Sequence, residues 1–222
     1  MKLSIIIPVR NEVANIRRLL ASLQPFRQRG HELIVVDGGS RDGTPAIARP
    51  FCDQCLLSEP GRAIQMSVGA CAANGEVLWF LHADSSVPAC ADQKIAQVLA
   101  GAKWGGFPVR LSGRLWLLRV VERLMNTRSR LTGILTGDQG IFVNRQLFER
   151  VGGFRDMPLM EDIDLSTRLR RVTRPVLADS VLGTSSRRWE AHGAARTIVR
   201  MWLLRLAFYL GVPARYLAAY YV

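Results

Sequence analysis

Apolar runs separated by helical periodicities fill the first half of the chain. Residues 3–9 form a largely apolar run, which is typical of a buried strand in a parallel sheet. Apolar side chains then recur at the spacing of one helix face, at Ile16, Leu19, Leu20 and Leu23. The pattern predicts a strand followed by a helix over residues 12–24, with Asn11 as the cap of that helix.

The same alternation continues beyond this first unit. A second apolar run, 33–36, stops at Asp37, and a Thr-Pro pair at 44–45 marks a helix start because proline is favoured in the first turn. A helical stretch over 64–74 and a strand over 77–81 follow. Alternating strands and helices predict a Rossmann-like α/β/α sandwich with a mostly parallel central sheet.

The second half of the chain is less regular, and its end differs in character. We expect one α/β domain over residues 1–195 and an amphipathic helical tail over 196–222. The tail is apolar but interrupted by arginines, and its longest uncharged run, 206–214, is far short of the ~20 residues that a membrane span requires. The tail therefore either lies in a membrane interface, or closes the core or a dimer contact.

Composition narrows the classes of function. The formal net charge is +12, and arginine carries nearly all of the positive charge because Lys2, Lys94 and Lys103 are the only lysines. Arginine suits bidentate contacts to phosphate, whereas no basic run interleaved with aromatic residues indicates a nucleic-acid surface. We therefore expect a phosphorylated small molecule or an anionic membrane as the partner, and no nucleic acid.

The cysteines and the N-terminus bear on the compartment. Cys52 and Cys55 form one Cys-x-x-Cys pair, but no second pair and no histidine cluster accompany it, so free thiols are favoured over a zinc site or a redox pair. The first apolar stretch is too short for a secretory signal. A reducing, cytoplasmic location is expected, with peripheral contact at the inner membrane face as its variant.

Polar side chains stand where the predicted strands end. Asp37 follows the second strand, residues 82–84 (His-Ala-Asp) follow the strand at 77–81, and Glu161 with Asp162 opens a helix. Ligands bind outside the carboxyl ends of the strands in an open parallel sheet, so we expect these groups to converge on one crevice.

Together these stretches resemble the family 2 glycosyltransferases of the GT-A fold. The resemblance rests on 5–12 and 37–44, on Gly-Arg-Ala at 61–63, on His-Ala-Asp at 82–84 in place of the family's Asp-x-Asp motif, and on Glu161-Asp162. Each stretch alone is common, but together they span most of the chain. Gly137–Gly140, 151–162 and 185–190 narrow the resemblance to a bacterial subgroup labelled radical-SAM/selenodomain-associated transferases.

The resemblance implies a donor site and a metal. The donor nucleotide would be held by Pro8, Val9, Asn11, Glu12, Asp37, Arg62 and Asp84. Asp84 would also bind Mg²⁺ or Mn²⁺, since such ions take one or two carboxylates plus phosphate oxygens. His82 and His192 are alternative ligands, and His82 departs from the aspartate of the family motif. Without the resemblance, Asp37 reads as an ordinary turn residue and Asp84 as a loop cap.

The resemblance also implies the catalytic base. Asp162 would take the proton of an acceptor hydroxyl, which needs a carboxylate within hydrogen-bond reach. The alternative is that Glu161 and Asp162 only match the helix dipole. The acceptor or phosphate side would be lined by Asp138, Gln139, Glu161, Arg187, Arg188 and Trp189. Asp138, Gln139 and the 187–189 segment could instead form a buried network or a surface turn.

We therefore expect an inverting transfer of a sugar from a nucleoside-diphosphate donor to a hydroxyl acceptor. A lipid-linked molecule is one acceptor of this kind. A sugar-nucleotide nucleotidyltransferase is one alternative, although residues 8–12 lack the glycines of its phosphate loop. A catalytically silent nucleotide-sugar-binding or membrane-associated scaffold is the other.

Overall fold

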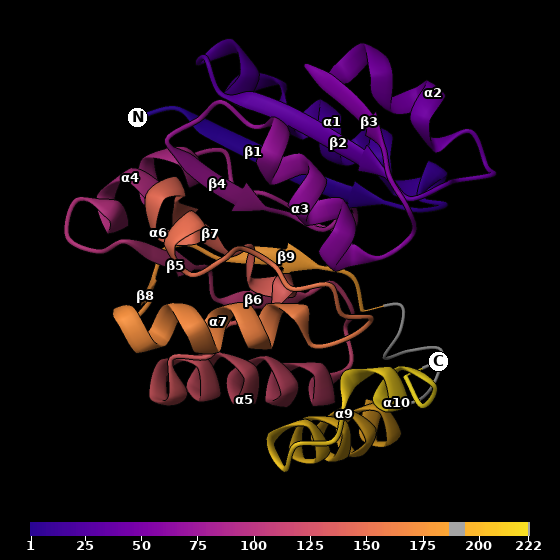
Figure 1. Ribbon diagram of the computed structural model, residues 1–222, viewed down its shortest axis with the longest axis vertical. Helices are drawn as coiled ribbons and strands as arrows, with labels where there is room; N and C mark the ends of the chain where they lie inside the picture. The colour runs from indigo at the N-terminus through magenta and orange to yellow at the C-terminus, as the bar shows by residue number, and fades with distance from the viewer. Residues whose placement is uncertain (187–193, 222) are drawn as a thin grey trace.

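A computed structural model describes residues 1–186 and 194–221, and Figure 1 shows their arrangement. Within these residues a seven-stranded sheet has the order β3-β2-β1-β4-β7-β5-β8. Its strands are β1 (Leu3–Val9), β2 (Glu32–Asp37), β3 (Gln54–Leu57), β4 (Val77–Phe80), β5 (Trp104–Gly106), β7 (Phe142–Asn144) and β8 (Val176–Leu177). Strands β1 to β4 are parallel, whereas β7 is antiparallel to both β4 and β5.

The register of the parallel strands brings their polar ends together. Val9 of β1 pairs with Asp37 of β2, so the loops that follow these two strands leave the sheet side by side. A smaller sheet pairs β6 (Val109–Leu111) with β9 (Leu182–Thr184), and a bridge from Ser86 to Gly183 ties it to the loop after β4. The carboxyl edge of the main sheet therefore faces this second sheet.

Helices cover both faces of the sheet and extend beyond it. They are α1 (Val13–Gln28), α2 (Thr44–Ala48), η1 (Arg49–Phe51), α3 (Arg62–Ala72), α4 (Ala91–Leu99), α5 (Trp116–Thr132), η2 (Gly137–Gln139), α6 (Arg145–Arg150), α7 (Glu161–Val172), α9 (Ala194–Tyr209) and α10 (Ala214–Ala218). The expected sandwich with a mostly parallel sheet is confirmed.

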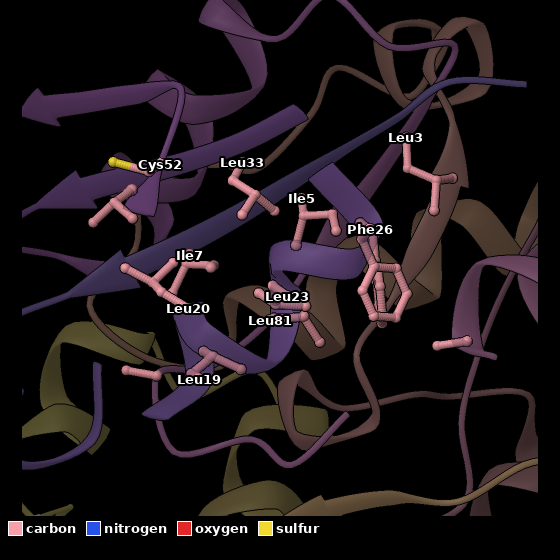
Figure 2. Close-up of a cluster of buried hydrophobic side chains, with 14 of the residues drawn as sticks. Leu3, Ile5, Ile7, Leu19, Leu20, Leu23, Phe26, Leu33, Cys52 and Leu81 are labelled. Carbon is pink, nitrogen blue, oxygen red and sulfur yellow. The ribbon is translucent and has the colours of Figure 1, made fainter. Parts of the chain in front are cut away.

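The strand β1 is buried on both sides, as its continuous apolar run requires. Ile5 and Ile7 pack in one core with Leu20 and Phe26 of α1, as Figure 2 shows. Ile6 faces the opposite core, which includes residues of α3 and α7. Alternate side chains of one strand therefore hold two helical layers in place.

Asn11 is not the cap of α1, which corrects the expectation from sequence. Its backbone is left-handed, with φ 54°, and its side-chain oxygen accepts the N–H of Arg41 at 2.8 Å. The N–H of Val13, in the first turn of α1, instead donates to Asp42 at 3.0 Å. A second loop thus supplies the cap, and Asn11 ties the two loops together.

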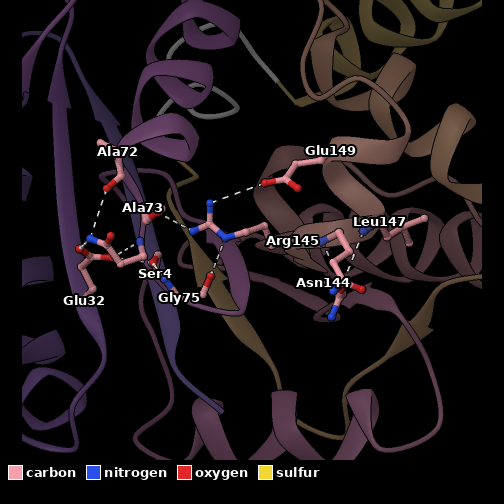
Figure 3. Close-up of polar contacts among 11 residues, drawn as sticks. Ser4, Glu32, Ala72, Ala73, Gly75, Asn144, Arg145, Leu147 and Glu149 are labelled. Atoms are coloured by element: carbon pink, nitrogen blue, oxygen red, sulfur yellow. Dashed lines mark hydrogen bonds and ion pairs between the residues drawn. The ribbon is translucent and has the colours of Figure 1, made fainter.

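The buried carboxylate of Glu32 lies at the opposite edge of the sheet, where β1 and β2 begin. Glu32 accepts hydrogen bonds from Ser4 Oγ at 2.6 Å and from the backbone N–H of Asn74 at 2.8 Å. Beside it, Arg145 donates to the carbonyl groups of Ala73 and Gly75 (Figure 3). These contacts lie at the edge away from the candidate site.

The C-terminal helices pack on the rest of the chain and also keep an exposed apolar side. Leu204 of α9 and Leu217 of α10 are buried against Ile134, Met160 and Ile163. Figure 1 shows these helices beyond α5, which α9 contacts. In residues 1–186 and 194–221, every helix is too short or too polar to cross a membrane. The division at residue 195 stays a prediction.

All four cysteines are free thiols, as expected, and Cys52 is buried in the core beside α1. Burial, with the nearby Cys55 and Asp53, raises the pKa of the Cys52 thiol to about 12. Cys52 is therefore a packing residue.

Candidate functional site

A cavity of about 760 Å³ opens at the carboxyl ends of β1 and β4. Segments that are far apart in the chain build its polar part: the end of β1, the start of α3, the loop after β4, the short helix η2 and the first turn of α7. The predicted residues that line it are Pro8, Val9, Glu12, Arg62, His82, Asp84, Asp138 and Asp162. The structure thus brings these eight positions to one cavity.

Asp162 is fixed by two backbone donors. One carboxylate oxygen accepts the N–H of Gly137 and the other accepts the N–H of Ile163, each at 2.8 Å. The residue before the Glu-Asp pair, Met160, has a left-handed backbone with φ 67° and forms the N-cap position of α7. This turn sets the acidic first turn of the helix against η2 and aims a half-buried carboxylate into the cavity.

His82 pairs with Asp138. Its Nδ1 lies 3.3 Å from the Asp138 carboxylate, and its Nε2 side faces Gly137, where an added Cβ would stand 2.5 Å from Nε2. Burial acts to lower the pKa of His82, but the contact with Asp138 outweighs it and raises the pKa. The imidazole is therefore held against η2, where it contacts Gly137 and Asp138, while Asp84 lies in the same cavity wall two residues further along the chain.

Arg62 is held by groups from the second half of the chain. Its Nε lies 3.5 Å from the carboxylate of Glu161, and its Nη2 donates to the hydroxyl of Tyr221 at 3.4 Å. Burial acts to lower the pKa of Arg62, but Glu161 and Tyr221 together raise it. For Glu161, burial and the neighbouring Asp162 raise the pKa, and Arg62 opposes them.

Among the residues that the structure describes, four predicted site residues do not line the cavity, namely Asn11, Asp37, Gln139 and Glu161. The carboxylate of Asp37 accepts N–H groups of Gly39 and Ser40 at 3.1 and 2.9 Å, within its own loop. Gln139 is fully buried, where its side chain accepts from Ser129 at 2.8 Å and from the N–H of Thr136 at 3.1 Å. For Gln139 the structure thus shows the buried network that was its alternative.

The cavity also contains residues that the sequence patterns did not indicate, among them Gln65, Arg128, Arg205 and Tyr221. Gln65 is buried and donates to the carbonyl groups of Val9 and Val36, so it supports the wall from behind. No local motif distinguishes these arginines from solvated ones. Arg187, Arg188, Trp189 and His192 lie outside the described residues.

The donor atoms in the cavity suit a hard cation that completes its coordination with phosphate. Within the described ranges, no cluster of three or more His, Cys, Asp or Glu side chains could hold a metal by itself. Asp84 nevertheless presents a carboxylate to the cavity. Mg²⁺ and Mn²⁺ prefer oxygen ligands, and Mg²⁺ typically takes one or two carboxylates plus substrate phosphates, so Asp84 fits such an ion.

Comparison with known proteins identifies the family. Residues 4–107 match the family described as Glycosyl transferase family 2. An uncharacterized glycosyltransferase of Mycobacterium tuberculosis is 31% identical over 188 residues, which cover 78% of this chain and 70% of that protein. The chain belongs to glycosyltransferase family 2. The narrower bacterial subgroup stays a prediction.

A further sequence relative and a solved structure show how much of their length the chain matches and which fold it has. Glycosyltransferase AglE of Haloferax volcanii is 36% identical over 92 residues, and the match covers 37% of this chain and 30% of that protein. A mannosyltransferase of Pyrobaculum calidifontis, in complex with GDP-Man and Mn²⁺, superimposes with a TM-score of 0.66 at 24% identity, covering 91% of this chain and 61% of that one. The likeness shows the GT-A fold that the sequence resemblance implied.

Proposed function

We propose that the protein transfers a sugar, with inversion, from a nucleoside-diphosphate donor to a hydroxyl acceptor. One observation carries the proposal: Asp84 and Asp162, far apart in the sequence, line the same cavity together with Arg62. Membership of family 2 supports the transferase over a nucleotidyltransferase. The match covers only part of AglE, so donor and acceptor are assigned here from the cavity.

The donor is placed along the ends of β1 and β4. Pro8, Val9 and Glu12 form the wall for the nucleoside, and Asp37 lies beside Val9 in the register. The diphosphate then lies toward Asp84, where a bound Mg²⁺ or Mn²⁺ would offset its charge as a Lewis acid. The complex of the Pyrobaculum mannosyltransferase with GDP-Man and Mn²⁺ supports the choice of a nucleoside-diphosphate sugar and a divalent cation. Asp84 is preferred to His82 as a ligand because Asp138 already engages the imidazole.

The base is assigned to Asp162. Its two backbone hydrogen bonds fix the carboxylate, so little reorganisation is needed when it accepts a proton. A bond forms between the acceptor oxygen and the anomeric carbon, while the bond from that carbon to the diphosphate breaks and its electron pair leaves with the phosphate. The acceptor proton passes to Asp162.

Donor turnover tests the base. Nucleoside diphosphate release from UDP- and GDP-sugars is measured with Mn²⁺ and with chelator, in the wild type, in Asp162→Asn and in the exposed control Asp156→Asn. We expect Asp162→Asn to lower kcat by about 10²–10⁴-fold and the control to match the wild type. Wild-type rates in Asp162→Asn would overturn the assignment of Asp162 as the base. If the wild type and both variants bind nucleotide but none turns it over, the scaffold alternative would be supported.

We also propose peripheral membrane contact through the C-terminal helices. Large apolar side chains of α9 and of the turn after it are exposed, including Leu203, Leu206 and Leu210, and Arg200 lies on α9 and Arg215 on α10. An exposed apolar face with arginines suits an anionic membrane interface.

Vesicle flotation tests this contact with the full chain. Leu206→Glu and Leu210→Glu should abolish binding to anionic vesicles, because a charge replaces an inserted side chain. Leu57→Glu is the matched control, since Leu57 is 76% exposed and Leu210 is 77% exposed. If the wild type does not float with vesicles, the contact is excluded.

A further inference from the structure

The cavity has two chemically different parts. The donor and base residues form the polar part, whereas the other part is apolar and lies between β6, α5 and α9. It is lined by Leu111, Val121, Leu124, Met125, Met201 and Trp202. The apolar lining reaches the surface, because Leu124 and Trp202 are 45% and 60% exposed. A nucleotide sugar has no group that requires such a wall.

Two arginines stand in the same wall, Arg128 on α5 and Arg205 on α9. The Nε atom of each is buried and has no hydrogen-bond partner in the part of the chain that the structure describes. A buried N–H without a partner costs free energy, which a bound anion would recover. Burial lowers the pKa of Arg128, and the charge of Asp162 opposes this, so the guanidinium lies within electrostatic reach of the base.

We propose that the acceptor is an anionic amphiphile. Its anionic group binds Arg128 and Arg205, its alkyl chain lies between α5 and α9, and its hydroxyl is presented to Asp162. Guanidinium groups bind phosphate or carboxylate through paired hydrogen bonds, which fits an anion between the two helices. This inference rests on the proposed function, and it adds the chemical class of the acceptor.

Calorimetric titration of the full chain separates the two recognition elements. The probes are octyl phosphate below its micellar concentration, octanol and inorganic phosphate. We expect octyl phosphate to bind at least about tenfold more tightly than either single-element probe, because both contacts are then made. A further titration with octanoate distinguishes a carboxylate headgroup from a phosphate headgroup.

Substitutions show which residues recognise the anionic group and which the alkyl chain. Arg205→Gln and Arg128→Gln should each weaken the binding of octyl phosphate by roughly tenfold or more and leave the binding of octanol unchanged. Trp202→Ala should weaken octyl phosphate and octanol but not inorganic phosphate. Arg130→Gln, on the exposed side of α5, is the control and should bind like the wild type. Thermal unfolding of each variant confirms that it is folded.

A separate titration with UDP or GDP and Mn²⁺ keeps the two proposals distinguishable. Equal affinities for octyl phosphate and inorganic phosphate would overturn the proposal that the acceptor is an amphiphile. Unchanged affinity for octyl phosphate in both arginine variants would overturn the proposal that these arginines bind its anionic group. If those variants lose nucleotide affinity alone, the arginines serve the donor and the acceptor inference fails. If the wild type binds no nucleotide, the proposed function itself fails.

Discussion

At the scale of single residues, Gly137 connects the two halves of the polar site. Its N–H donates to Asp162 at 2.8 Å, and its α-carbon faces the imidazole of His82. A side chain at this position would meet His82 Nε2 at 2.5 Å, so only glycine lets η2 come this close. The geometry of the base therefore depends on a residue that carries no functional group.

Replacing Gly137 by alanine should misplace both His82 and Asp162. We expect Gly137→Ala to lower kcat by roughly 10²-fold with a smaller change in the free energy of unfolding, because small displacements of reacting groups are costly. Steady-state kinetics and thermal unfolding measure the two effects. Gly101→Ala is the control, since nothing lies within 4 Å of its added Cβ. Equal kinetics in both variants would contradict this account of Gly137.

At the scale of elements, Glu32 joins the starts of β1 and β2 to the segment before β4. Burial acts to raise its pKa, but hydrogen bonds from Ser4, Asn74 and Gln54 outweigh this and lower the pKa below 4.5. A lowered folded-state pKa means that the ionised form stabilises the fold above pH 4.5 and that this stabilisation is lost as the pH falls through the lowered value.

Glu32→Gln should therefore lower the free energy of unfolding at pH 7 by about 2 kcal/mol, as expected for buried hydrogen bonds to a charged group. The difference from the wild type should narrow below pH 4.5, as the wild-type carboxyl also becomes neutral. Urea unfolding at pH 7, 5 and 3.5 measures this. A constant difference across the three values would contradict the assignment to the ionised carboxylate.

At the scale of the whole molecule, the C-terminal helices join the cavity to the rest of the fold. Leu217 packs with Met160 and Ile163 at the start of α7, and Tyr221 contacts Arg62 at the start of α3. The tail thus completes one wall of the cavity while its outer face stays exposed. The packed face agrees with the interpretation that the tail closes the core, whereas the membrane interface stays a prediction.

If the tail is part of the same folding unit, Leu217→Ala should lower the free energy of unfolding by about 2–4 kcal/mol, as core truncations do. Leu210→Ala, at a position 77% exposed, should change it by less than about 0.5 kcal/mol. Urea unfolding of the two variants measures the contrast. Equal values would indicate that residues 196–222 fold apart from the domain.

Donor and cation should stabilise the whole fold. At a hundredfold excess over its dissociation constant, UDP or GDP with Mn²⁺ should add about 2.7 kcal/mol to the free energy of unfolding, since only the native state binds it. Thermal unfolding should then occur at a higher Tm, and chelator should remove most of this shift. Identical Tm values with and without Mn²⁺ would argue against a cation between the diphosphate and Asp84.

The alternating architecture and the positions of the acidic residues follow from the amino-acid sequence alone. A buried strand and an amphipathic helix are recognised from neighbouring residues, because their periodicities are local. Parallel strands joined by helices place their carboxyl ends on one edge, so the sequence alone predicts that Asp84 and the end of β1 lie at one crevice. The family motifs added Arg62 and Asp162.

The partners of these residues are known only from the folded structure. Asp42, and not Asn11, caps the first helix. Gln139 lies in a buried hydrogen-bond network. Tyr221 contacts Arg62, which lies 159 positions earlier in the sequence. From the sequence, Arg128 of α5 and Arg205 of α9 resemble arginines exposed to solvent. They line one wall of the cavity together only because the two helices pack against each other. Such contacts depend on the distance between segments after folding, and no local pattern encodes that distance.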